Sequence, residues 1–281
     1  MEIIMFKKAF LSFVLILCVI CGSVVFTGAS GGTLSIYVNG TEIASDVSPY
    51  AKNNTTLVPV RAICNAIGID NILWDNGSKS VTVKGTSYIQ FTVGQSYAYK
   101  DGGRYSLSVP TEIKNGRTMI PLRFLAEAFG ADVSWDSVYN CVDIYKQGIS
   151  VPQSCRKNDY SKEEFEWLAR IVSAESAGEP FSGQVAVANV VLNRVKSAEY
   201  PDTIYGVVFD TKHGTQFQPV ANGTVYNVPS KTSVEAAKRA IMGENYVGDC
   251  LYFLNESTAT NNWIVKNREY YTTINNHSFY V

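Results

Sequence analysis

Residues 168–183 read LARIVSAESAGEPFSG and residues 183–195 read GQVAVANVVLNRV, and these stretches decide the fold of the carboxyl-terminal half. Apolar residues in the first stretch recur at helical spacing, which predicts a helix over about 162–177 that stops at Gly178. Pro180 suits the first turn of a second helix. That second helix is apolar on most sides, so we expect it to be buried in a core.

Glu175 shares one face of the first helix with three apolar residues, because Leu168, Ile171, Val172 and Glu175 stand at i, i+3, i+4 and i+7. A carboxyl group on such a face is partly desolvated, which raises its pKa and keeps it protonated towards neutral pH. A protonated carboxylic acid is the general acid that cleavage of a glycosidic bond requires. The alternative is that periodicity misleads near the helix end and Glu175 faces solvent.

Glu179 follows four residues later and has two interpretations. An acid in the first turn of the next helix interacts favourably with the helix dipole. If instead the two carboxyl groups lie close together, Glu179 would raise the pKa of Glu175 and assist its general-acid role. We therefore expect Glu179 to be a supporting residue.

The amino terminus has the pattern of a secretory signal. Lys7 and Lys8 precede an apolar run over 9–26, and small residues follow at 27–30. We predict a signal peptide over 1–29, with cleavage after Ala29. The run also approaches the ~20 residues that span a bilayer, so an uncleaved anchor fits the same pattern. In both cases the remaining chain lies outside the cytoplasm.

Composition indicates a folded protein of two domains. Hydrophobic residues make up 46% and charged residues 17% of 281 residues, which excludes a disordered chain. The formal net charge is −1, so no strong field attracts nucleic acid. Four cysteines follow the predicted signal without any CxxC pairing, which argues against structural zinc: Cys64, Cys141, Cys155 and Cys250. The compartment allows a disulfide, the spacing assigns no pair, and four free thiols fit equally well.

Residues 33–147 contain an internal repeat, in which residues 55–83 align with residues 117–144. Matching positions are Pro59 with Pro121, Arg61 with Arg123, Gly68 with Gly130, and Trp74-Asp75 with Trp135-Asp136. Each unit predicts a helix that starts after Pro and ends at Gly, followed by a strand, a Trp-Asp turn and a strand. The repeat predicts a small α+β domain.

This repeated Pro-x-Arg, Gly and Trp-Asp pattern resembles the copper amine oxidase N-terminal-like domain. The resemblance implies a stalk-like module of secreted bacterial proteins, which serves as a spacer or binds a wall or surface ligand. No His occurs in residues 33–147, so we expect no copper chemistry there. Residues 148–160 (GISVPQSCRKNDY) lack periodicity and predict a linker. Ser161 and Glu164 form a capping box that starts the second domain, 161–281.

The strings AESAGEP (174–180), SGQVAVANVVLNRVKS (182–197), LYFLNESTATNNW (251–263) and NNHSFY (275–280) closely resemble the SleB-type cell wall hydrolases. That family includes the spore cortex-lytic enzymes, which act in germination. The resemblance spans essentially all of 161–281. It implies a mainly helical, lysozyme-like α+β fold and cleavage of peptidoglycan glycan strands between N-acetylmuramic acid and N-acetylglucosamine. Glu175 matches the first Glu of the family's E-x-x-G-E-P motif, which makes it the expected catalytic residue.

The resemblance also implies a lytic transglycosylase mechanism, which needs one catalytic acid. A muramidase-type hydrolase would need a second carboxylate to activate water or act as the nucleophile. The other acids follow no persuasive motif: Asp202, Asp210, Glu235, Glu244, Asp249 and Glu256. A non-catalytic wall-binding protein would not need an acid on a core-facing stripe. The lack of a zinc motif argues against an amidase or peptidase.

The loop over 211–227 is the expected sugar-binding segment. Gln216, Phe217 and Gln218 match a Phe-centred motif of the family, and we expect them to bind substrate through amide hydrogen bonds and a ring face. The alternative is an ordinary surface loop with Phe217 buried. His213 and His277 lack a metal-ligand pattern, and His277 more readily hydrogen-bonds within a terminal strand. We therefore expect no metal and no cofactor.

Overall fold

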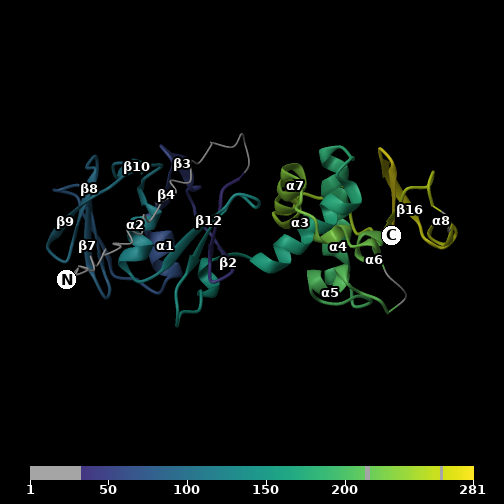
Figure 1. The fold of residues 1–281 in the computed structure, drawn as a ribbon, viewed down its shortest axis with the longest axis horizontal. Coiled ribbons are helices and arrows are strands. Elements are labelled where there is room, and N and C mark those ends of the chain that lie inside the picture. The colour runs from purple at the N-terminus through teal and green to yellow at the C-terminus, as the bar shows by residue number, and fades with distance from the viewer. Residues whose placement is uncertain (1–32, 213–215, 260–261) are drawn as a thin grey trace, which may run out of the picture.

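The computed structural model describes residues 33–212, 216–259 and 262–281. Figure 1 shows two domains arranged along the long axis of the molecule, a sheet-rich amino-terminal domain and a carboxyl-terminal domain built mainly of helices. This confirms the two-domain architecture. The predicted signal peptide over 1–29 lies outside the described residues.

The amino-terminal domain is built from three sheets, with strand orders β12-β13-β1-β2-β14, β10-β11-β4-β3 and β5-β6-β7-β8-β9. All strand pairs are antiparallel except β1 with β13. The strands are β1 (Ser35–Val38), β2 (Thr41–Ile43), β3 (Tyr50–Lys52), β4 (Thr55–Pro59), β5 (Ile72–Asp75), β6 (Ser80–Lys84), β7 (Tyr88–Thr92), β8 (Tyr97–Lys100), β9 (Gly103–Ser106), β10 (Glu112–Lys114), β11 (Arg117–Pro121), β12 (Asp132–Asp136), β13 (Cys141–Tyr145) and β14 (Arg156–Ser161).

Two short helices, α1 (Val60–Ala66) and α2 (Leu122–Ala128), lie between these strands. Each begins directly after a proline and is followed by a glycine with positive φ, 80° at Gly68 and 75° at Gly130. The expected helix starts and stops are therefore confirmed. Both segments contain a strand, a helix and two strands, and β4 pairs antiparallel with β11. Val58 and Ile120 face each other in this pair and are fully buried in the domain core.

The segment 148–160 is more ordered than the expected linker. It contains a 3-10 helix, Gln153–Cys155, and then enters β14, which pairs with β2 at the edge of a sheet of the amino-terminal domain. The absence of periodicity did not indicate an unstructured linker here, because an edge strand is held by its neighbouring strand rather than by an apolar face. The two domains are joined by a strand that belongs to the first of them.

The carboxyl-terminal domain begins with two long helices, α3 (Lys162–Ser176) and α4 (Phe181–Lys196). The capping box is confirmed, because the Glu164 amide donates to Ser161 Oγ at 3.2 Å and the Ser161 amide donates to Glu164 Oε2 at 3.0 Å. Helix α4 starts two residues earlier than expected, directly after Pro180. The remaining elements are α5 (Ile204–Val208), α6 (Gln218–Asn222), a 3-10 helix (Thr224–Tyr226), α7 (Lys231–Ile241), β15 (Tyr252–Leu254), α8 (Trp263–Asn267), β16 (Tyr270–Ile274) and β17 (His277–Tyr280).

Helix α4 is buried on nearly all sides, as its sequence predicts. Two of its polar side chains, Asn189 and Asn193, are paired with backbone groups of the segment that follows α7. Asn189 Nδ2 donates to the Glu244 carbonyl at 2.8 Å, and Asn193 Nδ2 donates to the carbonyls of Gly248 and Cys250 at 2.8 and 3.0 Å. Helix α4 thereby positions the chain that leads into the three-stranded sheet β15-β17-β16.

The two domains share a packed junction. Phe165 of α3 contacts two rings of the first domain, with centroid distances of 6.5 Å to Tyr37 and 5.7 Å to Tyr139. Lys238 of α7 is buried and donates from Nζ to the backbone carbonyls of Thr33 and Tyr139 at 2.8 and 2.9 Å. These contacts place part of the first domain in the core of the second.

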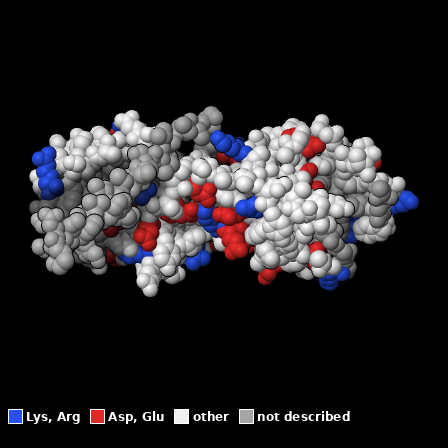
Figure 2. Space-filling model, viewed as in Figure 1, with Lys and Arg blue, Asp and Glu red and all other residues white. Residues whose placement is uncertain are grey.

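A charged cluster lies at the same junction, and Figure 2 shows basic and acidic side chains gathered where the domains meet. Lys162 Nζ lies 3.0 Å from Asp136, 2.7 Å from Asp143 and 3.2 Å from Glu166. Asp136, Cys141 and Asp143 are close enough to hold a metal ion, but the ammonium group of Lys162 already bonds both carboxylates. The ammonium group of Lys162 therefore supplies the positive charge that a metal ion would otherwise provide at these carboxylates.

Four cysteines of the described residues are free, and three of them are buried: Cys64, Cys141 and Cys250, with Cys155 half-buried. Of the two interpretations of their spacing, the free-thiol one agrees with this structure. None of the helices within the described residues combines the length and apolar character needed to cross a bilayer.

Candidate functional site

Glu175 lies in the last turn of α3, one residue before the helix ends. The three apolar residues that share its face, Leu168, Ile171 and Val172, have no exposed surface. Glu175 itself is half-buried. The predicted arrangement of one acid on a core-facing stripe is therefore present, because helical spacing holds to the end of α3.

Burial raises the pKa of the Glu175 carboxyl to about 7, and Arg194 opposes this shift by favouring the charged form. No hydrogen bond or ion pair joins the Glu175 carboxyl to another residue in the described part of the chain. An isolated, desolvated carboxyl group keeps its proton more readily than an exposed one. At neutral pH a large fraction of Glu175 is consequently protonated, as a general acid must be.

Arg194 of α4 is the residue near Glu175 that the sequence did not single out. Arg194 is 6% exposed, and its Nε donates to the Leu251 carbonyl at 2.8 Å. Three rings surround it, with centroids 5.0 Å (Tyr200), 5.2 Å (Phe217) and 5.9 Å (Tyr252) from the guanidinium carbon. Nη1 is fully buried and has no hydrogen-bond partner among the described residues. A buried arginine is rare, and its presence in an apolar helix was the available signal.

Glu179 does not support Glu175 in the expected way. Its Oε1 and Oε2 accept hydrogen bonds from the side chains of Asn276 and Asn275, both at 2.9 Å. Burial alone would raise the pKa of Glu179, but these hydrogen bonds outweigh it and hold the pKa below its usual value. Since Glu179 is not among the groups that shift the pKa of Glu175, the expected electrostatic coupling is wrong. Glu179 instead fixes the turn between β16 and β17.

Gly183 makes this arrangement possible. A Cβ atom at this position would lie 3.1 Å from Glu179 Cβ and 3.6 Å from Ile274 Cγ2. The first distance is shorter than ordinary van der Waals contact. A glycine in the first turn of α4 therefore lets Glu179 and the β16–β17 hairpin approach the helix closely.

The three expected sugar-binding residues have different surroundings. Phe217 is 2% exposed and packs in the domain core, against Arg194 and at 6.4 Å from the Phe253 ring. Its ring therefore has no free face for a sugar, and this part of the prediction is wrong. Gln216 is half-buried, and Gln218 is exposed at the start of α6.

His277 lies in β17 at the expected place, but its ring serves packing rather than the expected hydrogen bonding. The ring meets Phe253 edge-on at 5.2 Å, and Nδ1 is buried without a hydrogen-bond partner among the residues that the structure describes. Burial lowers the pKa of His277, which Glu179 partly opposes, so the ring is neutral near pH 7. His213 lies outside the described residues.

Asp210 is one further acid with an electrostatic link to this region. It favours the charged form of Arg194 but is not among the groups that act on Glu175. Its Oδ1 accepts a hydrogen bond from the Lys212 amide at 2.9 Å. Glu175 is thus the carboxyl group in this region whose surroundings favour the protonated form.

Both halves of the chain match known protein families. Residues 37–144 match the family model described as the copper amine oxidase N-terminal domain, and residues 178–280 match the one described as cell wall hydrolase. These matches agree with the two resemblances drawn from the sequence motifs.

Curated relatives match about two fifths of the chain. The spore cortex-lytic enzyme of Bacillus cereus is 43% identical over 118 residues, which covers 42% of this chain and 42% of the relative. The spore cortex-lytic enzyme of Oceanobacillus iheyensis is 41% identical over 116 residues, covering 41% and 39%. The chain spans less than half the length of these relatives.

Among solved structures, the catalytic domain of the germination-specific lytic transglycosylase SleB from Bacillus anthracis is 42% identical. The match covers 44% of this chain and 98% of that domain, with a TM-score of 0.41. The catalytic domain of the Bacillus cereus SleB protein is 39% identical, with coverage of 48% and 100% and a TM-score of 0.41. The carboxyl-terminal half of the chain is therefore similar to the SleB-type cell wall hydrolases, and its amino-terminal half is similar to the copper amine oxidase N-terminal domain.

Proposed function

We propose that this protein is a secreted enzyme that cleaves the glycan strands of peptidoglycan between N-acetylmuramic acid and N-acetylglucosamine. The observation that carries the proposal is the half-buried Glu175, whose pKa of about 7 suits a general acid at neutral pH. The match of residues 178–280, which begin three residues after Glu175, to the cell wall hydrolase family supports the choice of substrate.

In the proposed mechanism Glu175 acts twice. As an acid it donates its proton to the glycosidic oxygen, so that the bond from this oxygen to the anomeric carbon breaks. As a carboxylate it then accepts the proton of the muramic C6 hydroxyl group, whose oxygen bonds to the anomeric carbon. The product is a 1,6-anhydromuramic end, and Glu175 is protonated again for the next cycle.

Arg194 fits the second step of this mechanism. After proton donation Glu175 is an anion in a desolvated place, which is costly without a nearby cation. The guanidinium group of Arg194 favours the charged form of Glu175 and is itself fixed by the Leu251 carbonyl and three rings. Its charge brings the pKa of Glu175 down towards neutrality, which lets one group serve as acid and base.

The finer features of the prediction belong to the same proposal. We propose that Gln216 and Gln218 contact the sugar chain, that the catalytic domain over 161–281 is lysozyme-like, and that the signal over 1–29 directs secretion. Residues 55–83 and 117–144 are proposed to be copies of one unit within a stalk domain over 33–147. The common order of elements and the antiparallel pairing of β4 with β11 support this last point.

Digestion of purified peptidoglycan tests the reaction. We expect soluble muropeptides whose mass is that of the anhydro form, lower by one water than the reducing form, since the proposed mechanism uses Glu175 alone and no activated water. Mass spectrometry of the products before any chemical reduction makes the distinction. Reducing ends on every muramic residue would contradict transglycosylation and favour a muramidase-type hydrolase, while the absence of soluble fragments would favour a non-catalytic wall-binding protein.

A further inference from the structure

The amino-terminal domain contains two cavities at corresponding places of the segments 55–83 and 117–144. Their volumes are about 440 Å³ and about 350 Å³. Each is lined by the proline before a short helix, the arginine in the first turn of that helix and a tryptophan of the next strand. These residues are Pro59, Arg61 and Trp74 in the first cavity and Pro121, Arg123 and Trp135 in the second.

In the second cavity the arginine and two of the hydroxyl groups have partners within the protein. Arg123 Nη1 lies 3.2 Å from Glu127 Oε1 and donates to the Val133 carbonyl at 2.9 Å. The hydroxyl groups of Thr55 and Ser108 hydrogen-bond to each other at 2.8 Å. The charge of this arginine is therefore neutralised by its own helix.

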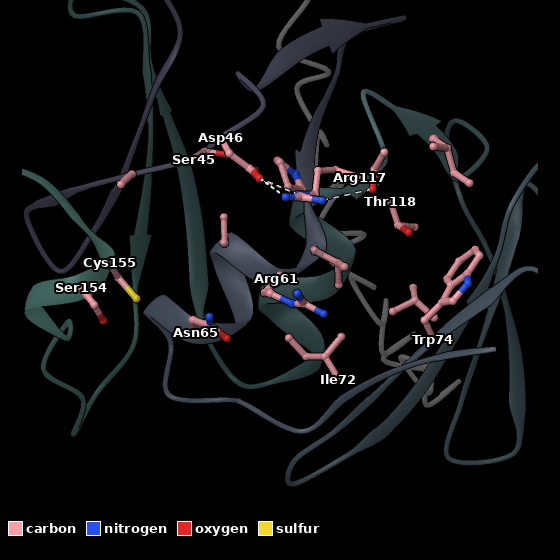
Figure 3. Close-up of a pocket in the computed structure, with 17 residues that line it drawn as sticks. Ser45, Asp46, Arg61, Asn65, Ile72, Trp74, Arg117, Thr118, Ser154 and Cys155 are labelled. Atoms are coloured by element: carbon pink, nitrogen blue, oxygen red, sulfur yellow. Dashed lines mark hydrogen bonds and ion pairs between the residues drawn. The ribbon is translucent and has the colours of Figure 1, made fainter. Parts of the chain in front are cut away.

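In the first cavity the side chain of the corresponding arginine has no partner among the described residues. Asn65 occupies the position that corresponds to Glu127, so α1 has no acid to neutralise Arg61. The Arg61 side chain forms no hydrogen bond or ion pair with any residue of the described ranges. Figure 3 shows its guanidinium group on the side of the helix that faces Trp74. Trp74 is 44% exposed, and its side chain has no ring or hydrogen-bond partner within the same ranges.

The other charged groups of the first cavity cancel one another. Arg117 donates from Nε to Asp46 Oδ2 at 2.6 Å, as Figure 3 shows. The net charge of the lining is therefore one positive charge, that of Arg61. Neutral polar and apolar side chains complete the wall, among them Ser45, Thr118, Ile72 and Ile113. Such a lining is complementary to one carboxylate group next to amide and small apolar groups.

We propose that this cavity binds a carboxylate-bearing peptide of the class attached to peptidoglycan as stem peptides; the choice of polymer rests on the proposed function. The guanidinium fork of Arg61 pairs with the carboxylate through two parallel hydrogen bonds. The indole ring of Trp74 packs on an adjacent apolar group. The first domain thereby holds the wall by its peptides while the second domain acts on its glycan.

Isothermal titration calorimetry of the intact secreted chain with the peptide L-alanyl-γ-D-glutamyl-diaminopimelyl-D-alanine tests this assignment. We expect saturable binding at one site with a Kd at or below about 1 mM. Arg61→Gln should weaken binding at least about tenfold, since it removes a charge-assisted bidentate contact. The Kd of Arg61→Lys should lie between those of wild type and Arg61→Gln, because lysine keeps the charge but lacks the two parallel donors of the guanidinium group. Arg123→Gln is the matched control and should bind like wild type.

Four results would overturn the proposal. The first two are that wild type does not bind the peptide, or that Arg61→Gln and Arg123→Gln weaken binding equally. The other two are that N-acetylmuramic acid binds more tightly than the peptide, or that inorganic phosphate at the same concentration competes with the peptide. N-acetylmuramic acid offers a sugar carboxylate in place of the peptide carboxylate, and inorganic phosphate offers a phosphate group. Arg61 is exposed, so its variants are expected to fold normally, which thermal unfolding verifies.

Digestion of glycan strands stripped of their peptides separates this proposal from the proposed function. Arg61→Gln is expected to digest such strands at the wild-type rate, because the cavity has no peptide to bind there. Loss of this activity in Arg61→Gln would contradict a peptide site. If the wild-type chain binds the peptide but digests no glycan, the proposed function fails and the binding site stands.

Discussion

Replacing Glu175 with Gln is expected to reduce the rate of glycan-strand cleavage by about a thousandfold or more, because the acid and the base of the proposed reaction are one group. Gln has nearly the same shape as protonated Glu, but its amide cannot donate a proton to the leaving oxygen. The measurement is the initial rate at which soluble muropeptides appear from purified peptidoglycan at equal enzyme concentrations.

Glu163→Gln is the matched control, since Glu163 is an exposed glutamate in the first turn of the same helix. It should digest like wild type. Digestion by Glu175→Gln at the wild-type rate would remove Glu175 from the reaction.

Urea unfolding tests whether the Glu175→Gln variant is folded. The folded-state pKa of Glu175 is raised from 4.5 to about 7. The contribution of its proton binding to the free energy of unfolding is therefore complete below about pH 4.5 and is lost as the pH rises through 7. Above pH 7 the wild-type protein must hold a desolvated carboxylate. The Gln variant should therefore resist urea better than wild type at pH 8, and this difference should shrink towards pH 4.5.

Replacing Lys162 with Met is expected to lower the free energy of unfolding by about 2 kcal/mol or more, because the change leaves partly buried carboxylates without their cation. Lys162 lies within 3.2 Å of the carboxylates of Asp136, Asp143 and Glu166, and its side chain is 18% exposed. The Met side chain keeps the length of the chain without the charge. Chemical unfolding followed by circular dichroism measures the loss.

Lys231→Met is the matched control for the junction. Lys231 begins α7 and is exposed, and its side chain has no ion pair or hydrogen bond to another described residue. Its replacement should change stability by less than about 0.5 kcal/mol. If the two variants unfolded alike, the charged cluster would not hold the domains together.

Local chemistry made much of the fold predictable. Pro and Gly bracket α1 and α2, and a capping box starts α3, so these boundaries depend on residues within one turn of the helix. Strand β14 was not predicted, since it is held by hydrogen bonds to β2, which lies far from it in the sequence. The junction was missed for the same reason, because Phe165 and Lys238 meet partners from the other domain.

The candidate site likewise contains residues whose surroundings could be predicted from the sequence and residues whose surroundings could not. Glu175 was predictable because the residues that bury its face belong to its own helix. The partners of Glu179 are Asn275 and Asn276 at the other end of the domain, and no spacing within one helix indicates them. Phe217 had the residue type of a sugar platform, but packing against Arg194 and Phe253 places it in the core.

The pH dependence of kcat/KM for wild-type cleavage of peptidoglycan tests the central claim most directly, namely that a protonated Glu175 is the only essential carboxyl group. The account predicts a plateau at acidic pH and a fall in rate above about pH 7, with an apparent pKa near that of Glu175. A bell-shaped profile with a second, acidic pKa near about 4 would reveal an essential carboxylate and contradict the account.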